Sequence, residues 1–130
     1  MGQDNCKLQP GDLIEIDQRF HQHWALYMGD GYVVTLTPGG ENSPPQLAGS
    51  VTIATKKAKA KKELLKEVAG NDEWRVNNKY DLYRTPFPME EIIRRAEQWV
   101  GKDVTYLLLH KNCEHFVTEL RYGKGVSAQV

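Results

Sequence analysis

The feature that most constrains the fold is a hairpin signal in the first third of the chain. Two short arms, residues 23–28 and 32–36, are rich in aromatic and β-branched residues and flank the Gly-Asp-Gly segment at 29–31. Glycine and aspartate tolerate the left-handed backbone angles of a tight turn. The pattern therefore predicts two antiparallel strands joined by this loop.

The expected register of that hairpin brings two polar side chains together. If residues 29–31 form the loop, Met28 faces Tyr32. Counting back along both arms then places His23 on the same sheet face as Thr35, one diagonal step away. We expect these two side chains to lie close to each other.

Local patterns along the rest of the chain predict a mixture of strands and helices. Three segments are predicted to be strands: residues 12–16, 74–76 and 104–109. A buried helical turn is the alternative for the short apolar run at 104–109. Helices are predicted between Pro88 and Gly101 and from Cys113 to about Tyr122, while residues 51–68 begin β-like and become helix-like. Residues 37–50 are predicted to be a long loop. Without a regular alternation of strands and helices, the fold class is α+β rather than a wound parallel sheet.

The length and charge of the chain limit the classes of function. With 130 residues we expect a single domain spanning 1–130. Seventeen basic residues balance seventeen acidic ones, which argues against a nucleic-acid partner. The two cysteines, Cys6 and Cys113, are too few for a disulfide framework, so we expect a cytoplasmic protein. We expect no signal peptide and no membrane span.

One local concentration of charge stands out against that balance. Six lysines lie between Lys56 and Lys66. The simpler interpretation is a solvated face. The alternative is a basic patch that contacts an anionic lipid surface.

Cys113 is the residue with the clearest chemical potential. It stands at the predicted start of the last helix, behind the good N-cap Asn112, where backbone amides and the helix dipole favour a thiolate. The alternative is a small apolar residue on the inner face of the helix, together with Phe116, Val117 and Leu120. Position alone leaves both interpretations open.

A thiol nucleophile needs a base, and the chain offers four histidines. His115 follows Cys113 by two residues in the same helix and projects about 200° away from it. His110 is more consistent with a loop or a strand end. His21 and His23 share strand parity, but only His23 begins an apolar arm that can hold an imidazole against the core. Zinc is disfavoured because paired ligand motifs are lacking, and no cofactor is expected.

Long stretches of the chain resemble the lecithin:retinol acyltransferase-like group, and within it the HRAS-like suppressor proteins, also called phospholipase A and acyltransferases. The matching stretches are residues 10–16 (PGDLIEI), 23–34 (HWALYMGDGYVV), 75–79 (RVNNK) and 112–123 (NCEHFVTELRYG). The resemblance implies a permuted papain-like, NlpC-type fold. In it an antiparallel sheet packs on helices and the nucleophile stands at a helix N-terminus.

The resemblance also implies a reaction and a set of site residues. Cys113 would be the nucleophile that takes an acyl chain from a phospholipid as a thioester, and His23 would be the base. The position of Thr35 usually holds a second histidine that orients the first, so Thr35 is the candidate orienting residue here. Gln18 stands where arginine is usual, with Arg19 adjacent, and His21 stands where tyrosine is usual.

Two functions from different classes follow. The first is a phospholipase A1/A2 and acyltransferase that acts on glycerophospholipids through an acyl-cysteine intermediate. The second is a non-catalytic module with the same fold that binds a host or viral protein partner, as in the picornaviral 2A branch. Cellular relatives carry a hydrophobic C-terminal anchor, which we expect to be absent here.

Overall fold

The computed structural model describes residues 8–18, 22–38, 55–107 and 113–123 of the chain. Within these residues six strands form one sheet in the order β5-β1-β2-β3-β4-β6, and each neighbouring pair is antiparallel. The strands are β1 (Leu13–Asp17), β2 (Gln22–Gly29), β3 (Tyr32–Pro38), β4 (Thr55–Leu64), β5 (Trp74–Val76) and β6 (Asp103–Leu107). The predicted α+β class with an antiparallel sheet is confirmed.

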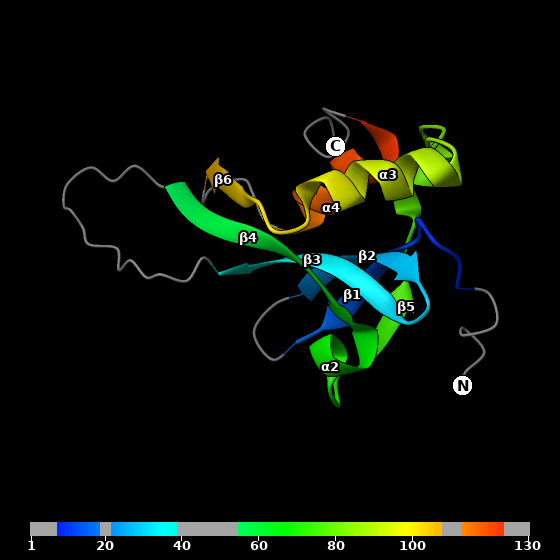
Figure 1. The fold of residues 1–130 in the computed structure, drawn as a ribbon. Helices are drawn as coiled ribbons and strands as arrows, with labels where there is room; N and C mark the ends of the chain where they lie inside the picture. The colour runs from blue at the N-terminus through cyan, green and yellow to red at the C-terminus, as the bar shows by residue number, and fades with distance from the viewer. Residues whose placement is uncertain (1–7, 19–21, 39–54, 108–112, 124–130) are drawn as a thin grey trace.

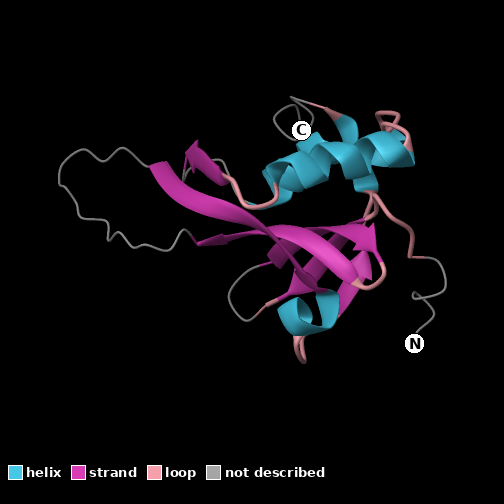
Figure 2. Ribbon diagram, in the orientation of Figure 1, coloured by secondary structure: helices cyan, strands magenta, loops and turns pink. Residues whose placement is uncertain are grey.

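Helices cover the two faces of the sheet unequally. Helices α3 (Met89–Trp99) and α4 (Cys113–Tyr122) lie together over one face, and the short α2 (Leu65–Ala69) lies on the other (Figures 1 and 2). The larger apolar core fills the space beneath α3 and α4 and includes Trp24 and Val117. A smaller core around Ile14 and Val33 packs against α2. No described helix is long and apolar enough to cross a bilayer.

The β2–β3 hairpin follows the predicted register except at its tip. Leu26 pairs with Val34 as expected, but Gly29 rather than Met28 faces Tyr32, and the register shifts between Tyr27 and Gly29. The loop is therefore Asp30 and Gly31, with φ angles of 56° and 87°. Two positive φ angles in succession are what a type I′ turn needs, and the twist of that turn matches the twist of paired strands.

The lysine-rich segment begins as a strand and becomes a helix, as its sequence pattern predicts, and the strand takes up most of its described residues. Residues 55–64 form the ten-residue strand β4, and only residues 65–69 are helical. The physical reason is pairing on both sides, with β3 and with β6. Ala58 and Ala60 alternate with lysines, and both alanines are buried in the larger core. A period of two is the pattern of a strand with one buried face.

The other predicted elements appear with small changes in their ends. Strands β1 and β5 and helices α3 and α4 lie where local patterns placed them, and β6 begins one residue earlier than expected. Residues 79–82 form a 3-10 helix, η1, for which local patterns predicted no helix. The expected loop begins after β3, because residues 37 and 38 still belong to that strand; residues 39–54 lie outside the described residues.

Candidate active site

Helix α4 places Cys113 at its first residue. The side chain of Cys113 is partly buried and packs against the larger core, while Val117 and Leu120, on the same inner face, are fully buried. Both sequence interpretations of Cys113 are thus visible in its position: it packs on the core and stands at a helix N-terminus. Asn112, the expected N-cap, lies outside the described residues.

Strand β2 brings His23 to this cysteine. The His23 Nδ1 atom lies 3.2 Å from the Cys113 Sγ atom. This is hydrogen-bond distance for a sulfur and a ring nitrogen. The two residues are 90 positions apart in the chain, and they meet because α4 packs across the middle of the sheet over β2.

Strand β3 supplies the contact on the other side of the ring. The His23 Nε2 atom lies 2.8 Å from the Thr35 Oγ1 atom. Thr35 is 1% exposed, so its hydroxyl is removed from solvent. His23 and Thr35 lie close together, as expected, and the contact between them is a direct hydrogen bond rather than one bridged by water.

The hydroxyl of Thr35 determines which ring nitrogen of His23 carries the proton. Thr35 Oγ1 also lies 2.8 Å from the backbone carbonyl oxygen of Trp24, which can only accept. The single hydroxyl hydrogen is therefore donated in a hydrogen bond to the Trp24 carbonyl. The hydroxyl oxygen must then accept a hydrogen bond from His23 Nε2–H. In the neutral ring this leaves Nδ1 unprotonated and facing the thiol of Cys113.

Burial sets the resting protonation state of the thiol. It raises the pKa of Cys113, as does the nearby charge of Glu114, whereas hydrogen bonds from the backbone of Trp24 and of Cys113 itself lower it. The net pKa is raised, contrary to the expectation that the helix N-terminus would favour a thiolate. Burial thus outweighs the backbone amides in the pKa of this thiol, and loss of its proton would be helped by a neighbouring base.

A charged pair borders the site. The Lys79 Nζ atom of η1 lies 3.2 Å from Oε2 of Glu114, the residue that follows Cys113. The same ammonium group lies 5.4 Å from the ring centroids of both Trp24 and Tyr80. The Tyr80 hydroxyl also donates to Glu114, at 3.4 Å.

Comparison with known proteins identifies the family of the chain. The lecithin retinol acyltransferase family matches residues 6–126. The chain belongs to the lecithin retinol acyltransferase family. It is 52% identical over 120 residues to rat phospholipase A and acyltransferase 1, and these aligned residues cover 92% of this chain and 71% of the relative. It is 53% identical over 122 residues to human phospholipase A and acyltransferase 3 (94% and 75%), and 44% identical to human phospholipase A and acyltransferase 4 (94% and 74%).

Among the other residues weighed in the sequence of this family member, the structure describes His115 and Gln18. His115 lies on α4 and pairs with Glu119 at 2.9 Å. Gln18 directly follows β1 and is partly buried. Cys6, Arg19, His21 and His110 lie outside the described residues.

Sequence reasoning missed the Trp24 carbonyl and the pair of Lys79 and Glu114. A backbone acceptor leaves no signal in a sequence. Lys79 closes the RVNNK stretch and Glu114 follows the cysteine in NCEHFV, so both stood inside motifs of the family resemblance. Their partnership required the fold, because η1 and α4 are distant in sequence. No cluster of three or more potential metal ligands occurs in the part of the chain that the structure describes.

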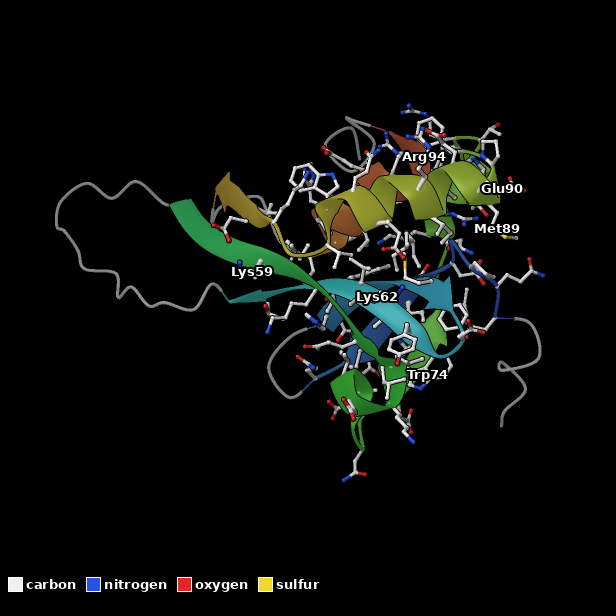
Figure 3. All side chains as sticks on the ribbon, in the orientation of Figure 1. Lys59, Lys62, Trp74, Met89, Glu90 and Arg94 are labelled. Carbon is white, nitrogen blue, oxygen red and sulfur yellow. The ribbon has the colours of Figure 1, made fainter. Side chains whose placement is uncertain are left out.

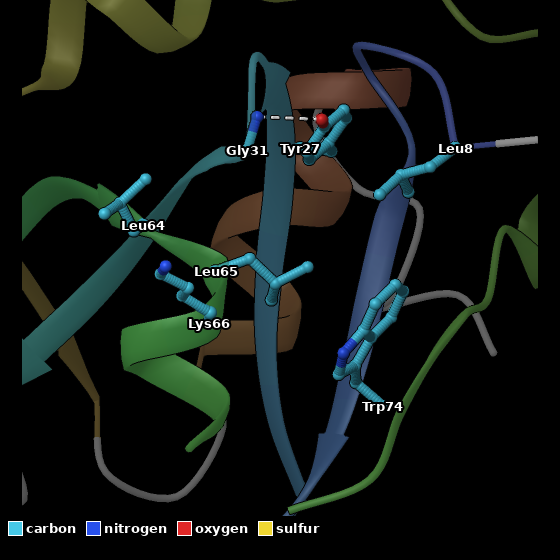
Figure 4. Close-up of a pocket in the computed structure, with 7 residues that line it drawn as sticks. All are labelled: Leu8, Tyr27, Gly31, Leu64, Leu65, Lys66 and Trp74. Carbon is cyan, nitrogen blue, oxygen red and sulfur yellow. Dashed lines mark hydrogen bonds between the residues drawn. The ribbon is translucent and has the colours of Figure 1, made fainter. Parts of the chain in front are cut away.

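This member of the lecithin retinol acyltransferase family also has a pocket that is separate from Cys113. It has a volume of about 470 Å³ and is lined mainly by apolar side chains on the α2 face of the sheet (Figure 4). Tyr27 and Trp74 line it and belong to the smaller core, whereas Cys113 packs on the larger core. The pocket is therefore not the site of the Cys113 and His23 contact.

Proposed function

We propose that this chain is a thiol-dependent phospholipase A and acyltransferase that acts on glycerophospholipids through an acyl-cysteine intermediate. The observation that carries the proposal is the 3.2 Å contact between Cys113 Sγ and His23 Nδ1. The names of the relatives, phospholipase A and acyltransferase, favour this interpretation over a non-catalytic interaction module.

In the first half of the reaction Cys113 is the nucleophile. His23 Nδ1 takes the thiol proton, and the sulfur attacks the ester carbonyl carbon of the phospholipid. The positive charge that forms on the ring is held by Thr35, whose oxygen accepts from Nε2–H. The tetrahedral oxyanion is stabilised by backbone amides at the start of α4. When it collapses, the ester bond breaks and His23 returns the proton to the departing lysophospholipid oxygen.

The second half of the reaction removes the acyl group from the sulfur. Water or an acceptor with a hydroxyl or amine group loses a proton to His23 and attacks the thioester carbonyl. The carbon–sulfur bond then breaks, and Cys113 takes the proton back. Water as acceptor yields phospholipase activity, and a lipid acceptor yields acyl transfer.

The lysine-rich strand supports a proposal for how such an enzyme meets its substrate. Lys61 and Lys66 are exposed, whereas Lys59 and Lys62 pair with Asp103 and Glu97. We propose a peripheral contact with anionic lipid headgroups through the first two, at the cytoplasmic side where a free thiol persists. Sedimentation with vesicles containing phosphatidylserine tests it: the variant Lys61→Gln/Lys66→Gln should bind more weakly at low salt. Equal binding of the variant and the wild type to these vesicles would contradict the proposed contact.

The acyl-transfer proposal is tested by covalent labelling. The chain is incubated with an acyl-fluorophosphonate or a fluorescent phospholipid, and added mass is assigned by peptide mass spectrometry. We expect mass on Cys113 in the wild type and in Cys6→Ser, and none in Cys113→Ser. His23→Ala should retain its fold and lose phospholipid turnover. A wild type that stays unlabelled and inactive would overturn the proposal, as would a Cys113→Ser variant with full turnover.

A further inference from the structure

Lys79 and Glu114 lie close to the nucleophile from two different elements. Glu114 follows Cys113 in α4, and Lys79 comes from η1. Their charged atoms are 3.2 Å apart, with the Lys79 side chain 47% exposed and the Glu114 side chain 24% exposed. The pair thus borders the site and is only partly screened by water.

The Lys79 ammonium is held in place by more than its ion pair. It lies 5.4 Å from the ring centroids of Trp24 and Tyr80, and both aromatic residues are 5% exposed. A cation over two fixed aromatic faces has few alternative positions. Trp24 is itself part of the site, because its carbonyl accepts the Thr35 hydrogen bond.

An unpaired carboxylate at position 114 would oppose the chemistry of Cys113. A negative charge one residue away disfavours a second negative charge on the sulfur. The charge of Glu114 is among the causes that raise the pKa of Cys113. Burial lowers the pKa of Lys79, but the hydrogen bond and charge of Glu114 outweigh it and raise the pKa, so Lys79 stays cationic at neutral pH.

We propose that Lys79 is a positioning residue that neutralises Glu114 beside Cys113 and thereby limits the repulsion that this carboxylate exerts on a negative charge forming at the sulfur. The proposal rests on the proposed function, in which Cys113 is the nucleophile. Lys79 acts through Glu114, so its effect on the sulfur depends on the carboxylate being present.

Other titratable or charged groups lie on the elements packed around α4. His23 of β2 contacts the sulfur itself. Tyr80 of η1 hydrogen-bonds Glu114, and Glu15 of β1 acts on the charge of Lys79. On α4, His115 pairs with Glu119, and from α3, Arg95 donates to backbone carbonyls at the far end of α4. The described neighbours thus include one carboxylate adjacent in sequence to Cys113, and Lys79 is its ion-pair partner.

The experiment measures the rate of iodoacetamide alkylation against pH in the full chain carrying Cys6→Ser, where Cys113 is the single thiol. We expect Lys79→Met to raise the midpoint by about one pH unit, because the carboxylate is then unmasked. Below the midpoint this corresponds to alkylation about tenfold slower. Lys79→Arg should keep the wild-type profile.

A double-mutant cycle separates masking from a direct effect of the lysine. In the Glu114→Gln background, Lys79→Met should shift the midpoint by less than about a third of its shift in the parent. Equal shifts in both backgrounds would mean that Lys79 acts directly on the sulfur, and the masking proposal would fail. Lys79→Gln repeats the test with a polar side chain if Lys79→Met melts early.

Lys62 offers a matched control. It also pairs with a glutamate, Glu97, at 2.9 Å, and lies 5.7 Å from the ring centroid of Tyr32. It belongs to β4, where Figure 3 labels it, and its glutamate partner is on α3 rather than on α4. Lys62→Met should leave the profile unchanged. An identical midpoint in Lys79→Met and its parent would overturn the inference alone, whereas a Cys113 that no variant alkylates at any pH would overturn the proposed function.

Discussion

The hydroxyl of Thr35 has one hydrogen, and it donates this hydrogen in a hydrogen bond to the carbonyl of Trp24. The oxygen is then left as an acceptor for His23 Nε2–H, and the ring presents Nδ1 to the thiol. A neutral hydroxyl can thus fix the tautomer of His23, and a second imidazole is not needed for this. The backbone carbonyl does this by removing the alternative in which Thr35 donates to the ring.

The residue-scale prediction follows from that geometry. Thr35→Val keeps the shape of the side chain and removes the acceptor for Nε2–H, so we expect phospholipid turnover to fall at least about tenfold. Thr35→Ser keeps the hydroxyl and should retain most of the activity. Turnover with micellar substrate, at matched fold by circular dichroism, is the measurement. Equal turnover in the valine and serine variants would show that another group orients His23.

At the scale of elements, the seam between β1 and β5 is held by charge. Arg75 of β5 lies 3.1 Å from Glu15 of β1 and also pairs with Asp17. Asn77 donates to Glu15 at 2.9 Å. Burial raises the pKa of Glu15, but hydrogen bonds from Asn77, Gln22 and Arg75, together with the charge of Arg75, lower it below its ordinary value of 4.5.

This lowered pKa makes the seam sensitive to acid. A carboxylate whose pKa is lower in the folded state adds stability that is present above about pH 4.5 and is lost as the pH falls through the folded value. We expect Arg75→Met to flatten that acid limb, because it removes part of the difference in pKa between folded and unfolded chains. Urea unfolding from pH 7 to pH 3 measures it. The control is Lys66→Met, which changes an exposed lysine on α2. An acid limb in Arg75→Met as steep as that of the wild type and of Lys66→Met would contradict the prediction.

At the scale of the whole molecule, Arg121 ties α4 to two distant segments. The guanidinium donates to the Gly11 carbonyl at 2.7 Å, just before β1, and to Asp81 of η1 at 3.0 Å. Tyr122 donates to the same carboxylate at 2.6 Å. Arg121 is 8% exposed, so these partners replace most of its hydration. The network holds α4, and with it Cys113, against the sheet.

Removing this arginine should cost far more than removing a surface one. Arg121→Met leaves the Asp81 carboxylate and the Gly11 carbonyl without their cation, so we expect a loss of about 3 kcal/mol in the free energy of unfolding. Arg94→Met removes an exposed pair with Glu91 on α3 and should change stability little. Urea unfolding of both variants is the measurement. Similar losses in the two would mean that the buried network contributes no more than a surface pair.

Most local elements could be predicted because their causes are local. The apolar stripe and the end signals of α3 and α4, and the turn chemistry between β2 and β3, act over a few residues, so they are readable in the chain. The position of Cys113 at the first residue of α4 belongs to this class, as does the parity that brings His23 and Thr35 to one face. The catalytic roles of these three residues remain proposals.

What the sequence by itself determined is thus the set of strands and helices, the α+β class and the short-range relation of His23 to Thr35. Only the tertiary structure decided where the strand β4 ends and α2 begins, because β4 pairs with both β3 and β6 and its pairing with β3 continues to Leu64. It alone brought His23 to Cys113 across 90 residues and Lys79 to Glu114. It also decided the protonation of Cys113, since burial depends on what packs around a thiol and leaves no mark on its neighbours in the chain.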